Sequence, residues 1–266
     1  MTCRPEFVQA GIFYGHDGMK ETLNTLSIGN LQLLQGEGGY RYSLDPILLS
    51  RFVQIKKAAR VVDLGAGCGI LPLLLARLSD AEELIGIEIQ SGLAERALRN
   101  IQLNDLQGRV QILSGDIRNI RNLLPVSSAD LVVSNPPYRP PGGGRIAPDG
   151  ERATARHELS GGLADFIAAA RWLLKNGGNF AVIYLAERLP ELMVKMIAAG
   201  IEPKRLRMIH SRQDAPAKIV LLEGCKGGRP GLAIEKPLFI YADCGVGRDY
   251  TEEVLRMYGE APGENP

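Results

Sequence analysis

Cysteine and histidine are scarce in this chain, and their spacing excludes two kinds of site. No two cysteines form a Cys-x-x-Cys pair, and none of the three histidines has the spacing of a metal ligand. The cysteines are Cys3, Cys68, Cys225 and Cys244. Neither a zinc site nor a disulfide framework is indicated, so we expect no bound metal and a reduced protein.

Long hydrophobic runs and an excess of one charge are also missing. No uninterrupted apolar stretch is long enough to span a bilayer, and the N-terminal residues lack the basic-then-apolar pattern of a secretion signal. We therefore expect a cytoplasmic protein without a membrane partner. The net charge of +1 says little about partners, since a balanced total can hide local patches. At 266 residues, 45% of them hydrophobic, the chain can bury a sizeable core.

Short β-branched runs alternate with helical segments from about residue 58 onward. The runs that predict buried strands are ARVVDLG, AEELIGIEI, RVQILSGD, ADLVVS and NFAVIYLA. This alternation is typical of βαβ units and a parallel sheet. Two further strand-like runs, EPKRLRMIHS and AKIVLLEG, have little helical signal between them and predict an antiparallel hairpin. The expected fold is α/β and Rossmann-like, with a mostly parallel seven-stranded sheet.

The two ends of the chain differ from this pattern. Residues 1–45 predict a small β-hairpin or cap, and SLDPILLSRFV predicts a short helix that Asp45 could cap, with Pro46 in its first turn. We expect the main domain over residues 46–225. Residues 226–266 are expected to form a β extension and tail, in which LAIEKPLFIY is either a hairpin on the sheet or a separate flap.

A glycine-rich loop follows the first predicted strand of the main domain. In DLGAGCG, Gly65 and Gly67 allow a tight turn and the close approach of a ligand to the backbone. Glu88 ends the second predicted strand, where it can accept hydrogen bonds from two ribose hydroxyls. This order of strand, loop, helix, strand and acid binds adenosyl cofactors in general. The alternative is a glycine-rich turn without a ligand.

Two details favour S-adenosylmethionine over a dinucleotide. The glycines are spaced G-x-G-x-G, whereas the dinucleotide fingerprint is G-x-G-x-x-G. Asp63 would repel a pyrophosphate, but it suits the ammonium group of a methionine moiety. After the third strand, Asp116 can accept from the adenine amine and Ile117 can pack on the ring, although Asp116 could equally be a turn residue.

The segment SNPPY follows the fourth predicted strand, ADLVVS. Methylation of an aromatic amine is difficult because the nitrogen lone pair is delocalised into the ring. The side-chain carbonyl of Asn135 and the backbone carbonyl of Pro136, stiffened by Pro137, could hold the two N–H bonds. Tyr138 offers a flat face on which a base can stack. The alternative is a turn that uses two prolines.

The series DLGAGCG, IEI, GD and NPPY resembles class I S-adenosylmethionine-dependent methyltransferases that modify amino groups. With GYRYSLDPILLS, ARHE and KIVLLEG, it resembles the tRNA1(Val) adenine-N6 methyltransferase-like family, whose members modify adenosine 37 beside the anticodon. The resemblance covers roughly residues 40–225 and implies the class I methyltransferase fold. It also implies that Tyr42, Ser43 and Asp45 line the methionine end. The other expected cofactor residues are Asp63, Gly65, Ala66, Gly67, Glu88, Ile89, Asp116, Ile117 and Asn135.

An RNA substrate requires contacts to phosphate groups. Residues 201–230 hold seven Lys and Arg against three Asp and Glu, and the loop 139–160 adds four arginines. We predict that RNA, with tRNA as the leading candidate, is bound by Arg139, Arg156, Arg205 and Arg207. The alternative is an ordinary solvated charged surface.

The predicted function is methylation of adenine N6 in tRNA. Alternatives that use the same corner are a guanine amine in rRNA and the glutamine amide of a release factor. The second is disfavoured because the region before Arg60 is short and β-like. An NAD-dependent oxidoreductase is disfavoured by the glycine spacing and NPPY, and a non-catalytic RNA-binding relative by the presence of Asn135 and Asp63.

Overall fold

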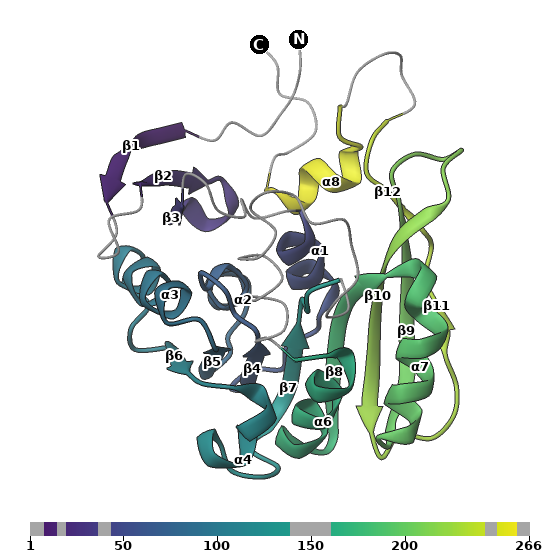
Figure 1. The fold of residues 1–266 in the computed structure, drawn as a ribbon. Coiled ribbons are helices and arrows are strands. Elements are labelled where there is room, and N and C mark those ends of the chain that lie inside the picture. The colour runs from purple at the N-terminus through teal and green to yellow at the C-terminus, as the bar shows by residue number, and fades with distance from the viewer. Residues whose placement is uncertain (1–7, 15–19, 37–43, 139–160, 243–248, 260–266) are drawn as a thin grey trace, which may run out of the picture.

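In the part of the chain that the structure describes, a nine-stranded sheet organises the fold (Figure 1). The computed structural model describes residues 8–14, 20–36, 44–138, 161–242 and 249–259. The strands lie in the order β11-β9-β10-β8-β7-β4-β5-β6, and β12 also pairs with β9. The parallel strands are β4 (Arg60–Leu64), β5 (Glu83–Glu88), β6 (Val110–Ser114), β7 (Ala129–Ser134) and β8 (Leu174–Leu185).

Beyond β8 the sheet contains an antiparallel hairpin. Strands β9 (Ile201–His210) and β10 (Ala217–Lys226) form a hairpin, and β10 pairs with β8. The expected α/β Rossmann-like fold with an antiparallel hairpin is therefore confirmed. LAIEKPLFIY forms neither a hairpin of its own nor a separate flap. Its two short strands, β11 (Ala233–Ile234) and β12 (Leu238–Phe239), each pair in parallel with β9 and extend the sheet.

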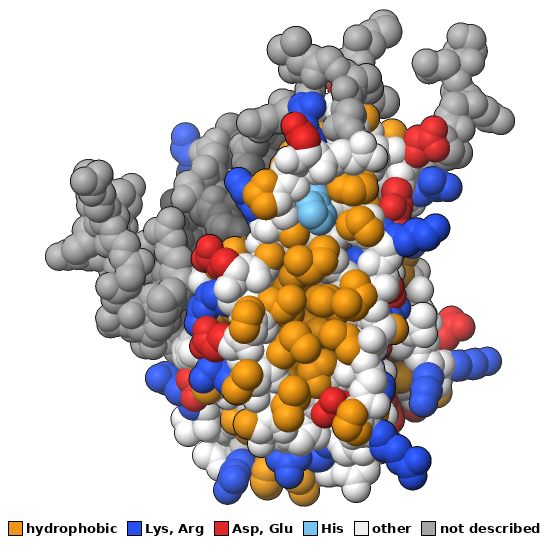
Figure 2. Space-filling model, turned by 90° about the vertical axis from the view of Figure 1, so that its right-hand side faces the viewer, with side chains coloured by type: hydrophobic (Ala, Val, Ile, Leu, Met, Phe, Trp, Pro, Cys, Tyr) orange, Lys and Arg blue, Asp and Glu red, His pale blue; other side chains and the backbone are white. Residues whose placement is uncertain are grey.

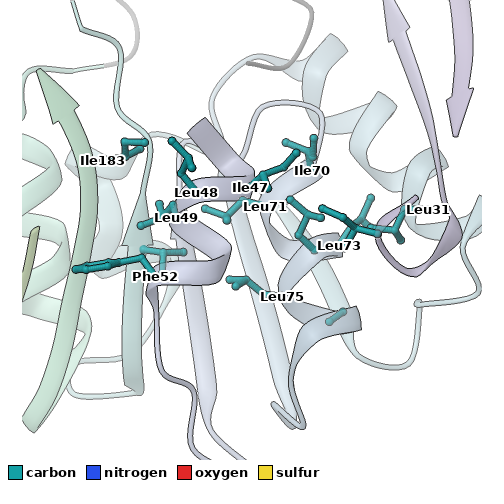
Figure 3. Close-up of a cluster of buried hydrophobic side chains, with 14 of the residues drawn as sticks. Leu31, Ile47, Leu48, Leu49, Phe52, Ile70, Leu71, Leu73, Leu75 and Ile183 are labelled. Atoms are coloured by element: carbon teal, nitrogen blue, oxygen red, sulfur yellow. The ribbon is translucent and has the colours of Figure 1, made fainter. Parts of the chain in front are cut away.

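Helices cover both faces of the sheet. Neighbouring residues of a strand point to opposite faces, so Val61 joins one buried cluster and Val62 the other. The first face carries α1 (Asp45–Phe52), α2 (Ile70–Leu78), α3 (Ser91–Leu103) and α8 (Glu252–Met257). The second carries α4 (Ile120–Leu123), α6 (Leu163–Leu173) and α7 (Leu189–Ala198). Figure 3 shows how α1 and α2 pack in the first cluster.

The N-terminal residues form a separate antiparallel sheet beside α3. It consists of β1 (Val8–Tyr14), β2 (Lys20–Leu26) and β3 (Leu31–Gly36), with the 3₁₀ turn η1 (Ile28–Asn30) before β3. Glu21 of β2 is buried and lies 2.7 Å from both Arg96 and Arg99 of α3. The two ion pairs tie this sheet to α3 and through it to the main sheet, because breaking both would leave the buried Glu21 carboxylate uncompensated.

One face of the molecule carries a patch of apolar side chains, which Figure 2 shows over α7 and the β9 edge. Exposed hydrophobic side chains on these elements include Val194 and Ile197 of α7 and Ile234 of β11. On the opposite side of α7, Leu192 and Met196 are fully buried against the sheet. This helix is therefore apolar on both its inner and its outer side.

Candidate functional site

Four of the predicted site segments meet at one edge of the sheet. They follow β4, β5, β6 and β7, which are neighbours in the parallel part. The carboxyl ends of parallel strands lie at the same edge, where ligands bind in open α/β sheets. The buried Ser134 hydroxyl donates to the carbonyl of Leu64 at 2.9 Å, which joins the ends of β7 and β4. The expected cofactor loop and the expected acceptor corner are thus held side by side.

The glycine loop takes a path that other residues adopt only with strain. Gly65, Gly67 and Gly69 have φ values of 78°, 57° and 82°. A Cβ on Gly69 would lie 3.0 Å from the Cβ of Ala97, so α3 packs directly against the loop. A Cβ on Gly67 would meet nothing within 4 Å among the described residues. The backbone at Gly67 therefore faces open space in which a ligand could lie.

Glu88 is buried at the end of β5 and supports this loop. Its Oε2 accepts the Gly67 N–H at 2.8 Å, and its Oε1 accepts the Gln90 N–H at 2.9 Å. Burial raises the pKa of Glu88, and the backbone N–H groups of Gln90, Gly67 and Ile89 act in the opposite direction. Because a carboxylate has about four acceptor sites, Glu88 retains the capacity to accept a further hydroxyl donor. Ile89, which follows it, is half-buried.

Asp63 has an unpaired buried oxygen. The residue is 3% exposed, and its Oδ2 has no hydrogen-bond partner among the described residues. Burial, and secondarily the negative charge of Glu88, raise the pKa of Asp63 to about 8. An unsatisfied buried carboxyl is costly, so the position fits a group that brings a positive charge or hydrogen-bond donors. The ammonium of S-adenosylmethionine has both.

Asp116 plays the turn role that the sequence left open. Its carboxylate accepts the Arg118 N–H at 2.9 Å, at the start of η2 (Ile117–Asn119), and forms an ion pair with the Arg118 guanidinium at 2.6 Å. The hydrogen bond from Arg118 holds the pKa of Asp116 below its usual range. Ile117 is buried in the second hydrophobic cluster. An adenine amine would thus share the Asp116 carboxylate with Arg118, a partner that sequence reasoning missed.

The NPPY corner leaves the sheet directly after β7. Pro136 is buried, whereas Asn135 and Pro137 are half-buried. The Tyr138 ring meets Tyr184 edge to face, with ring centres 6.0 Å apart and an angle of 68° between the planes. The Tyr138 hydroxyl donates to Asp45 Oδ2 at 2.7 Å, and its backbone carbonyl accepts from Arg188 at 3.4 Å.

Contrary to our expectation, Asp45 does not cap the short helix. The N-cap position is Leu44, Asp45 is itself helical, and Pro46 lies in the first turn as predicted. The physical reason is a partner 93 residues away, since the Asp45 carboxylate accepts from Tyr138 instead of capping its own helix. Sequence reasoning missed Arg188 as well, although its position just after the fifth strand of the main domain was a usable signal.

Two of the four arginines predicted to bind phosphate are engaged within the protein. Arg205 lies over the Phe52 ring at 4.1 Å and forms ion pairs with Glu223 at 3.4 Å and Glu235 at 3.2 Å. Arg207 binds the Lys236 carbonyl at 3.1 Å and Glu253 at 2.6 Å. These intramolecular contacts favour a structural role for both residues over the predicted contact to RNA. A count of charges along the chain does not reveal which acids they meet.

The remaining predicted residues are Tyr42, Ser43, Arg139 and Arg156. They lie outside the described residues, as does the whole loop 139–160. Within the described ranges, no three His, Cys, Asp or Glu side chains come together as metal ligands. In the same ranges, no helix has both the length and the apolar character needed to cross a membrane.

Comparison with known proteins places the chain among methyltransferases. Residues 50–140 match the family model described as TRM5/TYW2 methyltransferase domain. A tRNA1(Val) (adenine(37)-N6)-methyltransferase from Bacteroides fragilis (strain YCH46) is 28% identical over 216 residues, 81% of this chain and 84% of that protein. One from Porphyromonas gingivalis (strain ATCC 33277) is 31% identical over 189 residues, 69% of this chain and 73% of that protein.

Solved structures agree on the fold. Protein Atu636 from Agrobacterium tumefaciens, described as a predicted O-methyltransferase, aligns with a TM-score of 0.65 at 25% identity, over 84% of this chain and all of that one. TYW2 from P. horikoshii in complex with MeSAdo aligns with a TM-score of 0.54 at 17% identity, over 78% of this chain and 72% of that one. The second likeness bears on the fold alone.

Proposed function

The chain belongs to the tRNA1(Val) (adenine(37)-N6)-methyltransferase family and is an S-adenosylmethionine-dependent methyltransferase, and from this premise we propose that it methylates the N6 amine of an adenine in tRNA. The observation that carries the proposal is the junction of two segments. The buried Asp63 lies near the end of β4 and the glycine loop follows it, and Asn135 directly follows the neighbouring β7. A cationic cofactor and a planar amine would thus meet between them.

Residues of the first segment fit the cofactor. Asp63, with its unpaired Oδ2, would hold the ammonium group, and Glu88 would accept the ribose hydroxyls. Gly65, Ala66 and Gly67 would lie against the cofactor backbone. When bound, S-adenosylmethionine supplies a methyl group made electrophilic by its sulfonium.

Residues of the second segment fit the acceptor. Asn135 and the carbonyl of Pro136 would each accept one N–H of the amine and stabilise the positive charge that develops on its nitrogen. Tyr138, held against Tyr184, would support the base by stacking. No strong general base is required, because a methylated aryl ammonium loses its proton readily to water. Arg139 and Arg156 stay proposed contacts to the RNA, and with tRNA as substrate we propose a cytoplasmic site of action.

The division of labour along the chain is also a proposal. Residues 46–225 would form the methyltransferase domain, since they supply all the described residues of both segments. Residues 1–45 would form an N-terminal β cap and residues 226–266 a C-terminal β extension and tail. The separate sheet β1–β3 and the parallel strands β11 and β12 support these boundaries.

The test is methylation of defined substrates. Purified protein, labelled cofactor and tRNA from a strain that lacks this protein should yield N6-methyladenosine, detected by nucleoside mass spectrometry. The Asn135→Ala variant should yield none. Label found in a guanine amine, or in the glutamine of a release factor and not in tRNA, would contradict the proposed substrate.

A further inference from the structure

The buried carboxylate of Asp45 and the hydroxyl of the half-buried Tyr138 form a contact between the first helix and the acceptor corner. Asp45 is 5% exposed, and its Oδ2 lies 2.7 Å from the Tyr138 hydroxyl. A hydrogen bond from a phenol to a carboxylate is stronger than one between neutral groups, and burial limits competition from water. This contact therefore restrains the far end of the Tyr138 ring.

Tyr138 is held at two further points. Its ring packs edge to face on Tyr184, and its backbone carbonyl accepts from Arg188. Arg188 also bonds the Tyr184 hydroxyl and lies over the Tyr184 ring at 5.1 Å. The backbone, the ring edge and the hydroxyl of Tyr138 are thus each fixed by a different neighbour, which leaves the two side-chain torsions little freedom.

The helix that carries Asp45 is itself firmly anchored. Ile47 and Leu49 are fully buried in the cluster that Figure 3 shows. At its other end, Arg205 bonds the carbonyl of Phe52, and Arg51 donates to the carbonyl of Met257 at 2.9 Å. The C-terminal segment and the β9 edge therefore brace α1. Asp45 meets Tyr138 from a rigid support.

We propose that Asp45 is a positioning residue, which holds the Tyr138 ring in the plane on which the acceptor base stacks. This role differs from the expected one, in which Asp45 lines the methionine end of the cofactor, and the two predict different effects of mutation. It rests on the proposed function, since it needs a base that stacks on Tyr138. The plane of the ring then sets where the amine lies relative to Asn135, three residues earlier in the chain.

The proposal predicts a split between chemistry and cofactor binding. Loss of the contact lets the ring tilt, and a misplaced acceptor lowers kcat, by about 10- to 100-fold. The affinity for S-adenosylhomocysteine should stay within about twofold, because in this role Asp45 acts on the acceptor side and not on the cofactor. Mutation of a residue that binds the cofactor would instead weaken S-adenosylhomocysteine binding and leave kcat little changed.

The experiment compares five variants on tRNA. Asp45→Ala and Tyr138→Phe should each lower kcat, and the double variant should be no worse than the poorer single variant, since both remove the same bond. Asp45→Asn should restore most of the activity lost in Asp45→Ala, because its amide oxygen still accepts from the phenol. Ser50→Ala removes a buried hydroxyl of α1 that does not contact Tyr138; it is the control and should keep the wild-type kcat.

Three results would overturn the inference. They are a loss of S-adenosylhomocysteine affinity in Asp45→Ala by calorimetry, multiplicative effects in the double variant, and full activity in Tyr138→Phe. Tyr138→Phe removes a single oxygen and keeps the ring, so it gives a reading even if Asp45→Ala fails to fold. Absence of product with the wild-type protein would contradict the proposed function instead, and the same variants would then be compared on the substrate that does accept label.

Discussion

The side-chain amide of Asn100 donates to the backbone carbonyl of Cys68 at 2.9 Å, so that α3 holds the glycine loop. The same fully buried side chain accepts the Leu34 N–H at 2.7 Å and donates to the Leu34 carbonyl at 3.3 Å. One amide therefore connects the N-terminal sheet, α3 and the loop. Asn104, one turn later, bonds the Gln32 N–H at 2.9 Å and the Gln32 carbonyl at 2.7 Å. Together the two amides make the backbone hydrogen bonds that a neighbouring strand would otherwise make along the open edge of β3.

These paired amides predict a difference between two similar variants. Asn100→Ala should weaken S-adenosylhomocysteine binding about tenfold and lower the free energy of unfolding by about 2–4 kcal/mol, because it leaves several buried backbone groups unpaired. Asn104→Ala should lower stability by a similar amount and leave the affinity within about twofold. Calorimetry and urea denaturation measure both quantities. Equal losses of affinity in the two variants would show that Asn100 has no specific effect on the loop.

Glu88 is predicted to determine cofactor affinity. Glu88→Ala should weaken S-adenosylhomocysteine binding by about 1–3 kcal/mol, since it removes the acceptors for the ribose hydroxyls. The control is Glu83→Gln at the other end of β5, where the carboxylate pairs with Arg60 at 2.6 Å. An unchanged dissociation constant in Glu88→Ala would mean that this acid serves only to hold Gly67 and Gln90.

Asp63 is predicted to make stability depend on pH. Its folded-state pKa of about 8 lies above the ordinary value of 3.8, so between these values the folded protein binds a proton that the unfolded chain has lost. The stabilising contribution of Asp63 is therefore fully present below its ordinary pKa. As the pH rises from there through the folded-state pKa, the free energy of unfolding falls by up to about 1.4 kcal/mol per pH unit. Asp63→Asn should remove this part of the slope.

Urea denaturation of both ligand-free proteins at several pH values between these two pKa values gives the comparison. Burial also raises the pKa of Glu88 and Glu223, which act in the same direction, so the difference between the two proteins is the quantity to read. If the free energy of unfolding changes with pH in the same way in wild type and in Asp63→Asn, Asp63 does not stay protonated in the folded state.

Asn135 is predicted to act on the acceptor alone. Asn135→Ala should lower methyl transfer by at least about 100-fold, while S-adenosylhomocysteine binds within about twofold of wild type. Label incorporation and calorimetry measure the two effects. Asn176→Ala, an exposed position near the amino end of β8, should change neither. Loss of cofactor binding together with transfer would count against the role assigned to the amide.

Arg205 is predicted to stabilise the fold and not to bind RNA. Arg205→Met leaves the buried Glu223 unpaired and should lower the free energy of unfolding by about 2–4 kcal/mol, less than for a fully buried pair. The salt dependence of tRNA binding should stay unchanged. Lys218→Ala, at an exposed site on β10, is the stability control. A flatter salt dependence in Arg205→Met would restore the role in RNA binding that we first expected.

The order of the site along the chain could be predicted because it depends on local patterns. The alternation of strands and helices, the glycine spacing after Asp63, the acid at Glu88 and the corner at Asn135 are all signals within a few residues. A parallel sheet then brings the carboxyl ends of its strands to one edge, so the meeting of these segments follows from topology. For the same reason the cofactor class follows from the residues of these short segments alone.

By itself, then, the sequence determined the fold class, the cofactor and the sheet edge at which the site segments meet. Only the tertiary structure decided which partners the charged and polar side chains choose. Asp45 bonds a phenol 93 residues away instead of its own helix end, and Arg205 reaches a carbonyl 153 residues away. The physical reason is range: propensity and periodicity act over one or two turns, whereas such contacts arise only when packing has brought distant segments together.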